Sequence, residues 1–279
     1  MFFLKRLLEL PAFPLGPVLM LLATVATASN LGMTALLDDV IDGPHRSEEN
    51  RARDQYRHPK ETLLFFGLKP EMTVVEISPG AGWYTEIIAP VLRQKGKFIA
   101  AVPALSLETP DTFKRRDAAY KNMLISDPIL YGSSSSITFD PAKPSVAPPG
   151  SADMVLTFRN VHNWAKAGTS DSMFTAFYEA LKPGGILGVV EHRAKPGTSF
   201  QQQINSGYMT EAYVIATAQR AGFKLIATSE INRNPRDTAD YPGGVWTLPP
   251  SLRGVSDKDK PQYLIIGESD RMTLKFYKH

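Results

Sequence analysis

The residues of this chain best suited to chemistry stand where predicted buried strands end. Glu76 lies near the end of the apolar run 73–77, and a turn containing Gly80 and Gly82 follows it. Glycine lets the backbone approach a ligand without a Cβ clash, and the first turn of a helix presents unpaired N–H groups and a positive dipole end. In open α/β sheets, ligands bind at such junctions. The segment therefore predicts a binding site for a nucleotide-like cofactor.

A second group of polar side chains follows the apolar run 153–158. Arg159, Asn160 and His162 come directly after this run, and residues 191–193 end the next predicted strand at the same edge of the sheet. Histidine titrates near neutrality and can take a proton from a hydroxyl or an amine. We therefore predict His162 as a catalytic base, with Asn160 and Arg159 as further catalytic candidates and residues 191–193 ranked behind. A packed histidine bonded to a nearby carbonyl is the alternative.

The elements that must position these groups alternate between strand and helix. We predict strands at 73–77, 97–102, 137–139, 153–158, 186–190, 223–228 and 272–277, and helices at 29–41, 59–66, 84–93, 171–181 and 206–221. The region 105–131 is expected to be mostly helical, and the proline-rich segment 141–150 to be a loop. The strand at 153–158 is almost continuously apolar, as is typical of parallel strands buried on both faces. This alternation predicts a doubly wound α/β sheet.

Composition narrows the functional classes. The chain has 279 residues and is 43% hydrophobic, which suffices for one large domain with a sizeable core. Its formal net charge of +3 is spread along the sequence, without the basic block typical of a nucleic-acid groove, so we expect no nucleic-acid partner. The five histidines lie far apart, cysteine is absent, and no spacing matches a zinc or calcium loop, so we predict no metal site. Oligomeric state stays open.

The amino terminus has the three parts of a secretory signal peptide. Lys5 and Arg6 precede the apolar run 15–25, which closes on Ala26-Thr27-Ala28. We predict cleavage after Ala28 and a periplasmic or secreted mature protein with no stable membrane insertion. A retained amino-terminal membrane anchor is the alternative, although the apolar run is short for a membrane span.

The turn at 78–82 resembles the first motif of class I S-adenosylmethionine-dependent methyltransferases, Glu/Asp-x-Gly-x-Gly-x-Gly, with Ser78 in place of the first glycine. Residues 182–185, Lys-Pro-Gly-Gly, and residues 221–223, Ala-Gly-Phe, resemble the entries to the later strands of that family. The resemblance spans residues 57–277. It implies a Rossmann-like, mostly parallel seven-stranded sheet with a last antiparallel strand, and a methyltransferase-like domain at 59–279 preceded by a helical extension at 29–58.

The same resemblance implies how S-adenosylmethionine would be held. Glu76 would receive the amino group of the methionine part, while Ser78, Gly80 and Gly82 pass beneath it. Tyr84, together with Trp83 and Trp164, could form an aromatic wall that attracts the sulfonium by cation–π interaction. The alternatives are a strand-end acid bonded to turn amides for Glu76 and core packing for the aromatic residues.

The sequence departs from the family at the second strand. The acid that usually holds both ribose hydroxyls is absent, since residues 100–103 read Ala-Ala-Val-Pro. Asp140 stands at the end of the third strand, where the family contacts adenine; a turn-forming aspartate before Pro141 is the alternative.

A narrower resemblance is to a group of predicted exported bacterial methyltransferases. It is carried by residues 57–59, 82–84, 159–162, 245–250 and 267–274. The leading hypothesis is therefore a methyltransferase acting on a small-molecule acceptor, with S-adenosylmethionine as cofactor. A non-catalytic exported binding module that retains the fold is the alternative. A nicotinamide-dependent oxidoreductase fits less well, because the third glycine of Gly-x-Gly-x-x-Gly would fall on Thr85.

Overall fold

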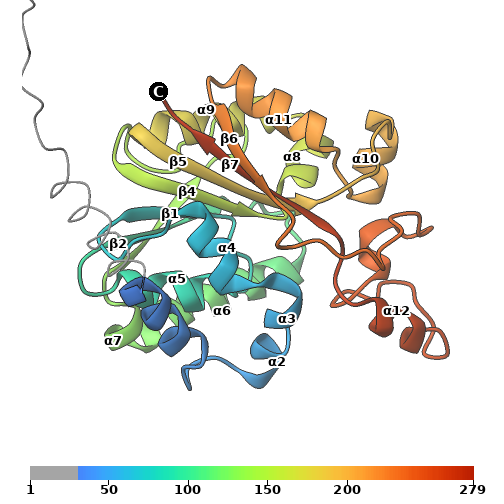
Figure 1. Cartoon of the computed structure of the whole chain (residues 1–279), viewed down its shortest axis with the longest axis horizontal. Helices are drawn as coiled ribbons and strands as arrows, with labels where there is room; N and C mark the ends of the chain where they lie inside the picture. Colours follow the sequence, from blue (N-terminus) through green and yellow to red (C-terminus); the bar gives the residue numbers. More distant parts are fainter. Residues whose placement is uncertain (1–30) are drawn as a thin grey trace, which may run out of the picture.

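A single mixed sheet of seven strands organises the molecule (Figure 1). The computed structural model describes residues 31–279, so the predicted signal peptide lies outside the described residues. The strands are β1 (Thr73–Ile77), β2 (Lys97–Pro103), β3 (Ser134–Phe139), β4 (Ala152–Phe158), β5 (Leu181–His192), β6 (Lys224–Ser229) and β7 (Arg271–Tyr277), in the order β3-β2-β1-β4-β5-β7-β6. Neighbours among β1 to β5 pair in parallel, and β7 runs antiparallel to both β5 and β6. The predicted Rossmann-like, doubly wound sheet with a last antiparallel strand is confirmed.

Helices cover both faces of the sheet. They are α2 (Glu48–Arg51), α3 (Asp54–Arg57), α4 (Pro59–Phe66), α5 (Thr85–Leu92), α6 (Asp111–Ser126), α7 (Pro128–Tyr131), α8 (Val161–Ala167), α9 (Ser170–Ala180), α10 (Phe200–Ser206), α11 (Glu211–Arg220), the 3₁₀ helix η1 (Gly244–Thr247) and α12 (Lys260–Ile266). Residues 31–41 are helical as well. No helix within residues 31–279 combines the length and the apolar character that a membrane crossing requires.

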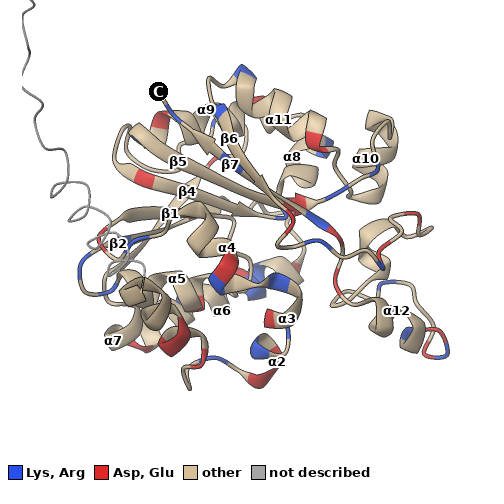
Figure 2. Cartoon of the chain, in the orientation of Figure 1, with Lys and Arg blue, Asp and Glu red and all other residues tan. Residues whose placement is uncertain are grey.

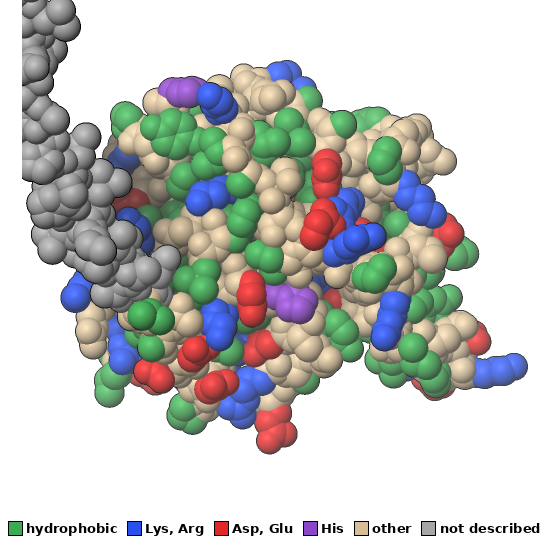
Figure 3. All heavy atoms as spheres, viewed as in Figure 1, with side chains coloured by type: hydrophobic (Ala, Val, Ile, Leu, Met, Phe, Trp, Pro, Cys, Tyr) green, Lys and Arg blue, Asp and Glu red, His purple; other side chains and the backbone are tan. Residues whose placement is uncertain are grey.

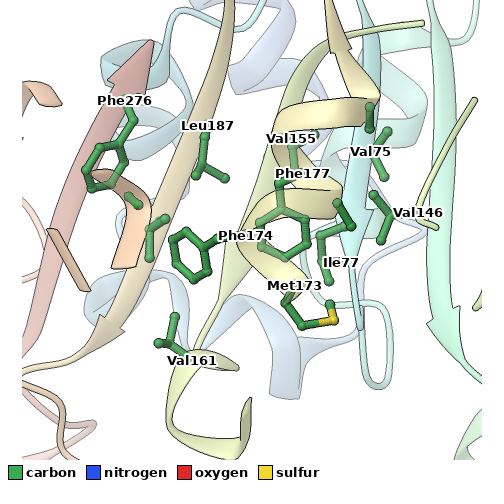
Figure 4. Packing of buried hydrophobic residues seen from close by; sticks show 14 of the residues in the cluster. Val75, Ile77, Val146, Val155, Val161, Met173, Phe174, Phe177, Leu187 and Phe276 are labelled. Atoms are coloured by element: carbon green, nitrogen blue, oxygen red, sulfur yellow. The ribbon is translucent and has the colours of Figure 1, made fainter. Parts of the chain in front are cut away.

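Two apolar layers hold the helices against the sheet. On one face, Phe174 and Phe177 of α9 pack against Val155 and Leu187 of the central strands (Figure 4). On the other face, α4 and α5 contribute to the second layer, in which Leu37 of the amino-terminal extension is also buried. Fully burying such side chains is worth about 1.5–3 kcal/mol each, so the two layers fix the strand ends that carry the polar groups. The boundary predicted at residue 58 stays a prediction.

Several helical segments differ from the expectation. The helix predicted at 206–221 is α11 and begins only at Glu211, because Gly207 ends the unpredicted helix α10 in the left-handed conformation with φ of 77° and the Thr210 side chain caps α11 by accepting a bond from the Tyr213 amide. The apolar spacing runs on through this break, so periodicity alone does not reveal it. The short helix α8, which carries His162, was not predicted. Its buried Trp164 and Ala165 pack into the core, and Gly168 ends it.

Candidate functional site

A cavity of about 740 Å³ opens at the carboxyl edge of the parallel strands. Most of the predicted site residues line it, namely Glu76, Ser78, Gly80, Tyr84, Arg159, Asn160 and His162. Further lining residues come from the start of β7, from α3, from α6 and from η1. The cavity lies within the usual range for small-molecule sites, at the place where open α/β sheets bind ligands.

The predicted glycine turn faces this cavity at Gly80. Its φ of 67° is in the left-handed region, and a Cβ added there would meet no atom within 4 Å. Ser78 also has positive φ, at 50°, and its amide donates to the Ala101 carbonyl at 2.8 Å. Serine can thus replace the family's glycine at a modest conformational cost, about 1–2 kcal/mol. The turn leaves open space beneath the position of a ligand.

Gly82 does not line the cavity, contrary to its predicted role beneath the cofactor. Its φ is 87°, and an added Cβ would lie 2.6 Å from the Met123 Cε atom and 3.1 Å from the Tyr120 ring. Both neighbours belong to α6. The glycine is therefore required by close packing of the turn against α6.

Glu76 is one of two acidic residues that line the cavity, and only 2% of its surface is exposed. The other, Asp117, forms an ion pair with Lys121 on α6. Its Oε2 atom accepts a hydrogen bond from the Thr85 hydroxyl at 2.6 Å, and that hydroxyl lies 3.1 Å from the Tyr120 hydroxyl. Burial raises the pKa of Glu76 to about 7, although the Thr85 bond favours the ionised form. Within residues 31–279 no cation forms an ion pair with it. A buried carboxyl held in this way is suited to a cationic ligand group.

The aromatic side chains after the turn have partners within the protein. Tyr84 stacks on Phe158 with ring centroids 3.5 Å apart, and its hydroxyl donates to the Arg57 carbonyl at 3.3 Å. Burial raises the pKa of Tyr84 to about 12. The guanidinium carbons of Arg57 and Arg46 lie 4.5 and 5.2 Å from the Trp83 ring centroid. These arginines therefore supply the cations that Trp83 contacts.

Trp164, the third residue of the predicted aromatic wall, is anchored in the core. Its ring packs edge-on against Phe177 and Phe174, with centroids 5.4 and 6.4 Å apart, although it also borders the cavity. Core packing, the alternative to a role in the aromatic wall, therefore describes Trp164.

His162 forms a buried pair with Glu191 at the end of β5. The His162 Nδ1 atom lies 3.1 Å from Glu191 Oε1, and the His162 amide donates to Oε2 at 3.3 Å. Glu191 is fully buried and also accepts from the His192 amide at 2.8 Å. A carboxylate on Nδ1 orients the ring and leaves Nε2 as the nitrogen that can exchange a proton with a ligand. Sequence reasoning named Glu191 only as a lower-ranked neighbour, because nothing local connects it to His162.

His192 extends this group. Its Nδ1 atom lies 2.6 Å from the Ser269 hydroxyl, and its ring centroid is 5.4 Å from that of His162. Burial, followed by the nearby His162 and Arg271, lowers the pKa of His192 well below its ordinary value. Side-chain atoms of His162, Glu191 and His192 all lie within 4.8 Å of one another, close enough to be considered as metal ligands. The expectation of no metal site, drawn from sequence spacing alone, stays a prediction.

Asn160 and Asp140 have structural partners. The Asn160 side-chain amide donates to the Ile77 carbonyl at 3.0 Å and to Thr157 Oγ1 at 3.2 Å, so it ties the end of β4 to β1 while bordering the cavity. Asp140 is exposed, does not line the cavity, and accepts a hydrogen bond from the Ala142 amide at 2.9 Å. The turn-forming alternative therefore describes Asp140, and its predicted contact with adenine is not supported by its position.

Four arginines form a cluster that the sequence did not predict as a group, although Arg159 was a predicted catalytic candidate. Arg53, Arg57, Arg159 and Arg271 all line the cavity, and three of them bond to one carboxylate, that of Glu268. Figure 2 shows charged segments meeting where β5 ends and β7 begins. Burial opposes ionisation of Glu268, but the charges of Arg271 and Arg57 outweigh it and hold the pKa of this carboxyl well below its usual range. We call these four arginines and Glu268 the arginine cluster.

Comparison with known proteins identifies the fold. No family model matches the chain, and no curated protein sequence matches it. A solved S-adenosylmethionine-dependent methyltransferase from Aquifex aeolicus superposes with a TM-score of 0.51 and 14% identity, over 88% of this chain and 98% of the other. The chain has a methyltransferase fold. A geranyl diphosphate C-methyltransferase from Streptomyces coelicolor, solved with S-adenosyl-L-homocysteine, superposes with a TM-score of 0.52 and 13% identity. The match covers 86% of this chain and 87% of that protein.

The fold alone does not decide the reaction. The [4+2]-cyclase SpnF superposes with a TM-score of 0.54 and 16% identity, over 91% of this chain and 95% of that protein. A cyclase and methyltransferases thus share this architecture, so the chemistry must be argued from the side chains of the cavity.

Proposed function

We propose that this protein is an S-adenosylmethionine-dependent methyltransferase that acts on a small-molecule acceptor. The observation that carries the proposal is Glu76, a buried carboxyl without a cationic partner among the described residues, next to the open turn at Gly80. The methionine part of S-adenosylmethionine has an ammonium group that suits such a carboxylate. Solved proteins of this fold that depend on this cofactor support the choice.

The cofactor supplies an electrophilic methyl group on sulfur, and the chain's residues must align the acceptor with it. The acceptor atom attacks the methyl carbon while the carbon–sulfur bond breaks and leaves its electron pair on sulfur. Where the acceptor carries a proton, His162 is placed to remove it through Nε2, because Glu191 holds Nδ1. The apolar walls at Phe158 and Trp246 exclude water from the reacting groups.

We also propose that the protein works outside the cytoplasm. The support is the sequence alone, with a basic pair, an apolar run and Ala26-Thr27-Ala28 before the folded domain.

Titration of the purified protein with S-adenosyl-L-homocysteine tests the cofactor proposal. Calorimetry should give a saturable one-to-one isotherm, and S-adenosylmethionine should compete for the same site. A flat isotherm with both compounds at millimolar concentration would contradict the proposal.

A non-catalytic binding module is the second candidate, and a specific observation favours it. No carboxylate ends β2, where Val102 and Pro103 border the cavity, so one expected contact to ribose is missing. The discriminating measurement is methyl transfer to a panel of small acceptors, followed by mass spectrometry. We expect turnover that falls about 10²- to 10⁴-fold in His162→Gln with unchanged S-adenosyl-L-homocysteine affinity. Cofactor binding without turnover on any acceptor would favour the binding module.

A further inference from the structure

The arginine cluster carries more positive charge than the protein neutralises. Arg53 Nε and Arg57 Nε lie 2.6 and 3.0 Å from Glu268 carboxylate oxygens, and Arg271 also bonds to Glu268. The Arg159 side chain forms no hydrogen bond or ion pair with any described residue. Among residues 31–279, Glu268 is the one carboxylate that pairs with this cluster. Four guanidinium groups therefore share a single negative charge.

The cluster also holds buried donors that have no acceptor. Arg57 Nη1, Arg57 Nη2 and Arg271 Nε are buried without a hydrogen-bond partner among the described residues, and each of the two residues is only 2% exposed. An unsatisfied buried donor is costly, and a charged one more so. Burial and the charge of Arg271 lower the pKa of Arg159 to about 10, which reflects the same crowding of like charges. A bound anion would relieve both penalties.

The position of the cluster points to the acceptor side of the cavity. Arg271 begins β7 and pairs in register with His192, whose ring lies beside that of His162. Arg159 directly follows β4, three residues before His162. The proposed base and the cluster are thus neighbours. Glu76 lies near the end of another strand, β1, and its buried carboxyl lines the same cavity.

The cluster is built from distant parts of the chain. Arg53 directly precedes α3 and Arg57 ends it, and more than 200 residues separate both from Glu268. Gly267 allows this approach, since a Cβ there would lie 2.4 Å from the Tyr56 ring. The Arg57 guanidinium is also held over the Trp83 ring. Such fixed donors are typical of a binding site, because they are oriented before the ligand arrives.

We propose that the acceptor carries an anionic group, a carboxylate or a phosphate, and that Arg57, Arg159 and Arg271 bind this group. The assignment of this anion to a methyl acceptor rests on the proposed methyltransferase function, whereas the anion site itself does not. The same chemistry could serve the carboxylate of the cofactor's methionine part, and the experiment separates the two sources.

The test uses inorganic phosphate as the probe. Calorimetric titration in a low-salt zwitterionic buffer should show saturable phosphate binding to the protein. Arg159→Gln should weaken this binding about tenfold or more, because a charge-assisted bond is lost. This variant removes no internal hydrogen bond of the side chain, so its melting temperature should be at least that of the natural protein. Arg220→Gln is the matched control, since Arg220 is exposed on α11 and pairs with Asp171 of α9. The phosphate affinity of this variant should be unchanged.

A second titration assigns the anion to the acceptor or to the cofactor. Protein saturated with S-adenosyl-L-homocysteine should still bind phosphate, and Arg159→Gln should retain its S-adenosyl-L-homocysteine affinity. Competition between the two ligands would overturn the assignment to the acceptor, because the cluster would then hold the cofactor carboxylate. Absence of phosphate binding at millimolar concentration, or equal binding by Arg159→Gln, would overturn the anion site. Phosphate binding without any S-adenosyl-L-homocysteine binding would instead overturn the methyltransferase function and leave the anion site standing.

Discussion

At the scale of single residues, the cavity presents the buried carboxyl of Glu76 and, from other elements, the arginine cluster. Among the described residues, the Glu76 carboxyl accepts a single hydrogen bond, whereas the arginine cluster provides donors in excess. The His162–Glu191 pair adjoins the basic group. A zwitterionic cofactor and an anionic acceptor would each find a complementary group in this arrangement.

Glu76→Gln should change how stability and affinity depend on pH. Burial raises the pKa of Glu76 to about 7 from the ordinary 4.5, so the folded protein binds this proton more tightly than the unfolded chain does. The free energy of unfolding should therefore fall as pH rises from about 4.5 to 7, by on the order of 3 kcal/mol. The variant should lack this contribution and unfold at a higher temperature than the natural protein at pH 8.

Ligand affinity should depend on pH in the opposite direction to stability. Only ionised Glu76 attracts an ammonium group, so affinity for S-adenosyl-L-homocysteine should increase as pH rises through 7 and should be lower in Glu76→Gln. Thermal unfolding and calorimetry at pH 5.5 and 8 measure both effects. Equal affinity of the two proteins at pH 8 would remove Glu76 from the ligand site.

At the scale of elements, the sequence predicted where strands end better than it predicted how helices break. The apolar runs at 73–77 and 153–158 place Glu76 and Arg159 correctly, because strands buried on both faces leave an unmistakable pattern. Periodicity could not find the break at Gly207, since apolar spacing continues across it. It also could not show that Gly82 faces α6, because a glycine in a turn has the same sequence signature whichever neighbour requires it.

The two glycines of the β1–α5 turn offer a paired test. Gly82→Ala should lower the free energy of unfolding by about 1–3 kcal/mol, because its Cβ would overlap Met123 and Tyr120 of α6. Gly80→Ala should cost only the strain of positive φ, about 1–2 kcal/mol, but should reduce S-adenosyl-L-homocysteine affinity because its Cβ enters the cavity. Urea unfolding and calorimetry on both variants measure the difference. If only Gly82→Ala lost S-adenosyl-L-homocysteine affinity, Gly82 and not Gly80 would be the glycine beside the ligand.

At the scale of the whole molecule, the sheet brings together residues that no local pattern connects. The sequence indicated the edge of the sheet and the cavity beside it, through Glu76, Ser78 and His162. It did not indicate the arginine cluster, because Arg57 and Glu268 meet only through packing of the first helices against the start of β7. Glu191 was underrated for the same reason. On the molecular face seen in Figure 3, acidic and basic side chains are interspersed. The excess of positive charge that we propose binds an anion lies inside the cavity, in the arginine cluster.

The most direct test of the account is a crystal structure of the protein with S-adenosyl-L-homocysteine. We predict that the ligand's amino nitrogen lies within about 3 Å of the Glu76 carboxylate, above Gly80, with the sulfur directed toward the space between His162 and the arginine cluster. Density for the ligand elsewhere, or a cavity that stays free of ligand at saturating concentration, would contradict the central claim.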